Sequence, residues 1–314
     1  LLPDALHPNA EGAGILARTV YGALTGDYGG LQLPAIYSDR MVLQRDQPLP
    51  ISGIANQGEK VTVTLAGQRK ETVAGTNGKW TVTLDPLRVS GKSYTLTVST
   101  PSRTLNYRDV VAGEVWLCSG QSNMEMQVEG WGKVKNYEQE KEEANNYPNI
   151  RFLLVENAMS PTPVENITAK ENGWQVCTSK SVADFSAAGY FFGRDLNKYR
   201  NVPIGLIDTS WGGTIIETWT SNEALATIPS MKKRLEALVG LPASQEGRKK
   251  KFEEDVETWK SEVERIDKGC VNGEAIWAAP DFNDAAWKSM KVPGLMQEQD
   301  LPGFSGLVWF RKTI

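Results

Sequence analysis

GEVWLCSGQSNM, at residues 113–124, changes abruptly from an apolar run to small and amide residues grouped around one serine. Val115 to Cys118 has the composition of a buried strand, and the small residues after it favour a sharp turn. An α/β hydrolytic enzyme presents its nucleophile in this way, because the turn leaves a hydroxyl exposed where the strand ends. The segment therefore predicts Ser122 as a candidate nucleophile, with an ordinary strand-to-loop turn as the alternative.

This block, taken with its flanks, closely resembles the nucleophile block of the sialate O-acetylesterases, a branch of the SGNH/GDSL hydrolase superfamily. The resemblance implies that Ser122 is the nucleophile of a carbohydrate O-acetylesterase that needs no metal and no organic cofactor. It also implies a flavodoxin-like parallel sheet with helices, an acetylated glycan as substrate, and a periplasmic or extracellular location.

A second block, DTSWGGTIIETW at residues 208–219, follows an apolar run at 204–207. Two adjacent glycines leave backbone N–H groups unobstructed, and an oxyanion hole needs such donors where negative charge develops on the attacked carbonyl. The block also matches the second block of the resembled family. We expect Gly213 to be the oxyanion donor, with Gly212 as the second choice, and Glu217 and Trp219 to pack or hydrogen-bond beneath the site.

The general base presents a problem, because the sequence contains one histidine, His7, far upstream of Ser122. Residues 2–13 resemble the closing Asp-x-x-His block of an SGNH hydrolase, in which Asp4 would orient the His7 ring. In the family this block follows the serine. We therefore expect residues 1–30 to be the tail helix of an upstream SGNH module and its linker, so that Asp4 and His7 serve another site. A circularly permuted enzyme, in which His7 serves Ser122, is the alternative.

The remaining chain suggests a multidomain fold of α/β and all-β parts. At 31–110 we expect a β-sandwich support, because runs at 61–65, 80–84 and 94–98 alternate apolar residues with threonine, and Asn77-Gly78 is a hairpin signal. At 111–221 we expect the first part of an SGNH sheet, with strands at 115–118, 150–155 and 204–207 and a helix at 183–199. A helical excursion is expected at 222–272. Residues 273–314 resemble the start of a galactose-binding-like jelly roll, and both chain ends look cut.

Composition excludes some functions and leaves others open. A net charge of −4 argues against nucleic-acid binding, and no run approaches the ~20 apolar residues of a membrane span. The three cysteines fit no metal-site spacing. Sialic acid is the first expected glycan, with acetylxylan-type esterase or a catalytically incomplete carbohydrate-binding or scaffold fragment as alternatives. By itself the chain is expected to have little or no esterase activity.

Overall fold

The computed structural model describes residues 10–160, 164–239, 245–299, 301–304 and 306–312. The chain divides into two compact units, residues 1–243 and 244–314. In the first unit the elements follow in the order α1 (Ala10–Thr25), β1 (Val42–Gln44), β2 (Leu49–Ile54), β3 (Lys60–Leu65), β4 (Gln68–Val73), β5 (Lys79–Leu84), β6 (Tyr94–Ser99), β7 (Thr104–Cys118), α2 (Ser122–Glu125), α3 (Tyr137–Ala144), β8 (Ile150–Leu154), η1 (Lys170–Asn172), β9 (Gln175–Val176), α4 (Ala187–Arg200), β10 (Ile204–Asp208), η2 (Ile216–Trp219), α5 (Asn222–Ala226) and α6 (Pro229–Val239).

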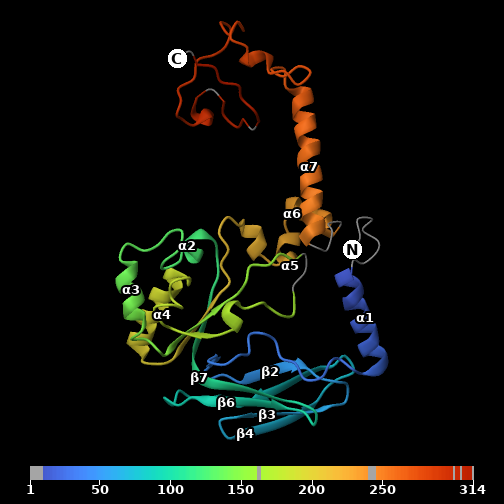
Figure 1. Cartoon of the computed structure of the whole chain (residues 1–314), viewed down its shortest axis with the longest axis vertical. Coiled ribbons are helices and arrows are strands. Elements are labelled where there is room, and N and C mark those ends of the chain that lie inside the picture. Colours follow the sequence, from blue (N-terminus) through green and yellow to red (C-terminus); the bar gives the residue numbers. More distant parts are fainter. Residues whose placement is uncertain (1–9, 161–163, 240–244, 300, 305, 313–314) are drawn as a thin grey trace. The chain divides into compact units, whose positions relative to one another are not determined.

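One long strand, β7, joins the antiparallel and parallel parts of the first unit (Figure 1). Its 15 residues pair antiparallel with β6 up to Val110 and parallel with β10 from Glu114 to Cys118. The resulting sheet has the order β4-β3-β6-β7-β10-β8-β9, and β1 adds to β7 in parallel at Val111–Gly113. The sequence suggested that a domain ends near residue 110, but the backbone pairing continues through that point. A single β-sheet with both antiparallel and parallel strands therefore carries the nucleophile segment, and the first unit is a mixed α/β fold.

The antiparallel strands form two β layers around one apolar core. β2 and β5 make a separate two-stranded sheet, whose buried Ile51 and Trp80 join Val63 and Leu96 of the large sheet in one cluster. The strands expected at 61–65, 80–84 and 94–98 are confirmed as β3, β5 and β6. Their alternation places one side chain in two toward the shared core, as the burial of every second residue in β5 shows.

The prediction of a β-hairpin at Asn77-Gly78 is wrong. The turn is present, with Gly78 at a φ of +73°, but the strands on either side belong to different sheets, since β4 pairs with β3 and β5 pairs with β2. The hairpin forms one turn earlier, between β3 and β4, where Ala66 and Gly67 both have positive φ as a tight two-residue turn requires. Strand β4 was missed because its sequence, QRKETV, is polar and half exposed.

The parallel half of the sheet places helix α4 on one face. β10 lies between β7 and β8 and is parallel to both, which confirms the strands expected at 115–118, 150–155 and 204–207. The helix expected at 183–199 is present as α4; it begins after Ser186, whose Oγ accepts the Gly189 N–H at 3.0 Å. Phe192 of α4 meets Trp116 edge to face with ring centroids 5.0 Å apart. A Cβ on Gly189, in the first turn of α4, would lie 2.9 Å from Cys118 Sγ, so the carboxyl end of β7 lies beside the start of this helix.

The second unit contains helix α7 (Gln245–Ile266), η3 (Ile276–Ala278) and η4 (Met296–Glu298). Its aromatic residues pack on one another, with Trp277 in contact with Phe282, Trp287 and Trp309. The described residues of 273–314 form no strand. The jelly-roll assignment of 273–314 stays a prediction. Of the helices that the structure describes, none has the length and apolar character that a membrane span needs.

Candidate active site

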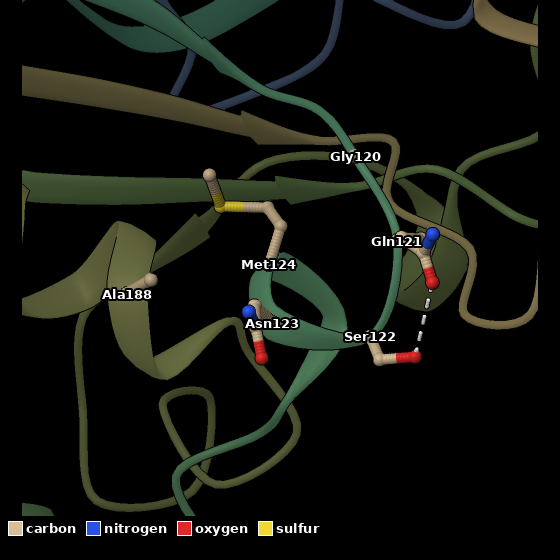
Figure 2. A pocket seen from close by; sticks show the side chains of 6 residues that line it. All are labelled: Gly120, Gln121, Ser122, Asn123, Met124 and Ala188. Carbon is tan, nitrogen blue, oxygen red and sulfur yellow. Dashed lines mark hydrogen bonds between the residues drawn. The ribbon is translucent and has the colours of Figure 1, made fainter. Parts of the chain in front are cut away.

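Ser122 lies at the first turn after the nucleophile strand. β7 ends at Cys118, and Gly120 takes a φ of +145°, a backbone conformation that residues with a Cβ rarely adopt, before Ser122 begins α2. Residues 120–124 and Ala188 line a hollow of about 590 Å³. Figure 2 shows the side chains of these residues, with the Ser122 hydroxyl directed toward Gln121. Ser122 Oγ is 3.5 Å from Gln121 Oε1, its hydrogen-bond partner. The sequence-predicted nucleophile is thus partly exposed at a strand end.

The glycine loop after β10 lies directly against the nucleophile loop. The Thr209 N–H donates to Cys118 O and the Trp211 N–H donates to Gly120 O, both at 2.9 Å. These two bonds extend the parallel pairing of β10 and β7 beyond the ends of the strands. A Cβ placed on Gly212 would lie 3.4 Å from Ser122 Oγ. The structure therefore brings together Ser122 and Gly212, which the sequence separates by 90 positions.

The two glycines differ in what their backbone N–H groups can do. The Gly212 N–H donates to Glu125 Oε2 at 2.9 Å, so it is occupied by a carboxylate. Gly213 has a φ of +77°, and its N–H forms no hydrogen bond with any residue that the structure describes. Ser122, as the first residue of α2, has no intrahelical acceptor for its own N–H. Gly213, the first choice from the sequence, keeps a free donor, whereas Gly212, the second choice, does not.

A buried carboxyl group, which the sequence analysis missed, lies at the end of β10. Asp208 is 3% exposed, and its Oδ1 accepts the Ser210 N–H at 2.9 Å and the Ser210 hydroxyl at 2.5 Å. Burial raises the pKa of Asp208, while its hydrogen bonds from Ser210 and from the Ser186 backbone act in the opposite direction. The signal in the sequence is one acidic residue closing an otherwise apolar strand, IGLID. Asp208 fixes the start of the glycine loop.

Trp219 supports the same loop from its other end. The indole N–H of Trp219 donates to Thr214 Oγ1 at 2.8 Å, and the Thr214 hydroxyl donates to Trp211 O at 2.7 Å. Glu217 was expected beside it, but its Oε1 lies 3.8 Å from Nη1 of Arg234 in α6. Trp219 therefore hydrogen-bonds to the loop as the sequence suggested, whereas Glu217 forms an ion pair with an arginine of α6.

The buried cysteine beside the site adds no reactive group to it. Asp4 and His7 lie outside the described residues. Cys118 is buried, and burial together with the nearby Asp208 carboxylate raises the pKa of its thiol to about 12, so it stays a neutral thiol. Among the described residues there is no cluster of histidine, cysteine and acidic side chains that could hold a metal ion.

Comparison with known proteins places this site in a recognisable context. Residues 112–266 match the family model for carbohydrate esterase, sialic acid-specific acetylesterase. The sialate O-acetylesterase of Rattus norvegicus is 29% identical over 324 aligned residues, covering 95% of this chain and 54% of that protein. The sialate O-acetylesterase of Homo sapiens is 34% identical over 212 residues, covering 62% of this chain and 40% of that protein.

A solved structure agrees with these sequence matches. The crystal structure of a carbohydrate acetylesterase from Xanthomonas citri aligns with a TM-score of 0.59 and 33% identity, covering 63% of this chain and 44% of that one. The chain spans about half the length of the curated relatives it matches. Together the matches support the resemblance to the sialate O-acetylesterase family.

Proposed function

We propose that the protein is a carbohydrate O-acetylesterase in which Ser122 is the nucleophile. One observation carries the proposal: the glycine loop after β10 lies against the nucleophile loop, so that a Cβ on Gly212 would come within 3.4 Å of Ser122 Oγ, and the next residue, Gly213, keeps a free N–H. Both loops fall inside the segment that matches the carbohydrate esterase family model. The parallel order of β7, β10 and β8 also supports an SGNH-type sheet, which we propose as the fold of this half.

The geometry supports a two-step acyl transfer. In the first step the Ser122 oxygen bonds to the acetyl carbonyl carbon while a base takes the hydroxyl proton. The carbonyl oxygen becomes an oxyanion, which the N–H groups of Ser122 and Gly213 stabilise in place of water. The bond from the acetyl carbon to the glycan oxygen then breaks, and the glycan oxygen takes a proton. In the second step water attacks the acetyl-serine and releases acetate.

A histidine held by a carboxylate is the base that this chemistry uses most often. Asp4 and His7 form an Asp-x-x-His pair in the sequence, and we keep the proposal that they belong to an upstream site and not to Ser122. The substrate is an O-acetylated sugar, with O-acetylated sialic acid proposed first because the matched relatives carry that name.

Acetate release measured on the full-length protein tests the proposal. We expect acetate from an O-acetylated sialic acid and from an aryl acetate, and covalent labelling of Ser122 by a fluorophosphonate. Ser122→Ala should abolish both, because losing a serine nucleophile costs about 10⁶-fold in rate in a serine protease, and should leave the thermal unfolding temperature unchanged. Labelling at Ser119 or Ser210 would show that the nucleophile is misassigned.

A further inference from the structure

Glu125 belongs to the nucleophile turn, and its carboxylate reaches across to the glycine loop. It closes the short helix α2, where its own N–H donates to Gln121 O at 2.9 Å. Its carboxylate accepts the N–H of Gly212, from the opposite loop, at 2.9 Å. A Cβ on Gly212 would overlap this carboxylate. Glu125 is thus a side-chain link between the nucleophile turn and the glycine loop.

We propose that Glu125 is a positioning residue, whose carboxylate holds the Gly212 peptide so that the next N–H, that of Gly213, faces the reacting carbonyl. The proposal rests on the proposed function for the reaction that is served. Its structural content is independent of that function: the Gly212 N–H is a loop anchor, and the Gly213 N–H is the donor left over for a ligand.

The glycine loop is fixed on both sides of Gly213. Before it, the Trp211 N–H bonds to Gly120 O and the Gly212 N–H bonds to Glu125. Around it, the Thr214 hydroxyl bonds back to Trp211 O at 2.7 Å. Gly213 stands between these anchors with a φ of +77°, and a Cβ there would meet no atom within 4 Å. A donor that is fixed by its neighbours requires no reorganisation during the reaction.

The contacts favour an anchor over a proton acceptor. The hydrogen-bond partner of Ser122 Oγ is Gln121, at 3.5 Å, whereas the Glu125 carboxylate is bonded to a peptide N–H. A bond from an N–H to a carboxylate is charge-assisted and stronger than one to a neutral acceptor. A neutral amide oxygen can nevertheless take the same N–H. The two roles therefore predict different behaviour for Glu125→Gln.

The test compares Glu125→Ala and Glu125→Gln in the full-length protein, with an aryl acetate as substrate. For Glu125→Ala we expect kcat to fall about 10²-fold, since a misplacement of about 1 Å costs about that much. The KM should change less than about 3-fold, because the donor acts on the transition state. For Glu125→Gln we expect kcat within about 10-fold of the natural protein. Glu142→Ala, on the exposed surface of α3, is the matched control and should change neither constant.

A second measurement, amide hydrogen exchange, tests the hydrogen bond between Glu125 and Gly212 without any reaction. In the natural protein, NMR should show slower hydrogen exchange for the Gly212 amide than for the Gly213 amide. Glu125→Ala should raise the Gly212 exchange rate at least about 10-fold and leave that of Val115, in β7, unchanged. If the natural protein neither hydrolyses acetates nor is labelled at Ser122, the proposed function fails, and the exchange of Gly212 still decides whether Glu125 anchors the loop.

Two results would overturn the inference. Glu125→Gln as inactive as Glu125→Ala, with the acidic limb of the pH–rate profile lost, would make Glu125 a proton acceptor. An exchange rate of Gly212 that is the same with and without the carboxylate would show that Glu125 does not hold the loop.

Discussion

Gly212→Ala is the sharpest test of how the two loops meet. The added methyl group would overlap the Glu125 carboxylate and lie 3.4 Å from Ser122 Oγ, so the carboxylate must move away. That movement breaks the 2.9 Å bond from the Gly212 N–H. A hydrogen bond to a charged group contributes about 1.5–3 kcal/mol. If that loss falls on the transition state, kcat/KM decreases about 10- to 150-fold.

The assay is steady-state hydrolysis of an aryl acetate by the full-length protein, with the urea midpoint measured in parallel. We expect the loss in kcat to exceed what the change in urea midpoint explains, because the overlap involves the end of a flexible side chain and no backbone atom. Gly14→Ala, in α1, is the matched control, because the nearest atom to its added methyl group would be 3.8 Å away. A Gly212→Ala protein with unchanged kcat and unchanged stability would refute the contact between the loops.

Three further predictions concern Asp208, His7 and the β layers. Because burial raises the folded-state pKa of Asp208 above 3.8, the folded protein binds this proton more tightly than the unfolded chain does. The resulting contribution to stability is full below pH 3.8 and is lost as the pH rises through the folded pKa. Asp208→Asn should therefore cost less stability at pH 7 than at pH 3.5 in urea unfolding, and a cost that grows with pH would contradict this. His7→Ala should leave fluorophosphonate labelling of Ser122 unchanged, and loss of labelling would favour the permuted arrangement. We expect residues 31–110 to be a support, so Arg69→Ala, at an exposed position of β4, should leave unchanged whatever glycan affinity calorimetry detects; loss of binding in a folded Arg69→Ala protein would assign glycan recognition to these strands.

A substitution that disturbs the contact between α4 and β10 should lower the stability of the fold and should not act directly on the reaction. Gly193 of α4 lies against Leu206 of β10, where a Cβ would come within 2.6 Å of Leu206 Cδ1. Leu206 belongs to the cluster of buried side chains between the helix and the parallel strands, and Gly193 is buried against it. Close approach of α4 to the sheet keeps the start of this helix beside the nucleophile loop, which is why Ala188 lines the same hollow as Ser122.

Local sequence determined the strands and the position of the candidate nucleophile. Val115 to Cys118 is apolar and is followed by turn-forming residues, so a buried strand ending at a serine turn could be predicted without knowing its neighbours. The alternation in 80–84 likewise predicts which side chains enter the core, and all three expected runs form strands. These features depend on residues within a few positions of one another, and that is the range over which periodicity and turn chemistry act.

Tertiary structure decided the pairing of strands and the roles of single polar groups. The Asn77-Gly78 turn joins two sheets because β5 finds its partner in β2, some 30 residues away, and β7 continues past residue 110 because β6 and β10 pair with its two halves. The N–H of Gly212 is taken by a carboxylate 87 positions upstream, and Asp208 accepts hydrogen bonds from the backbone of Ser186, just before α4, and from Ser210 of its own loop. A sequence pattern shows that Gly212 and Gly213 can both donate. Only the packing of the two strand ends leaves Gly213 free, because an N–H is available only if no other acceptor in the fold reaches it first.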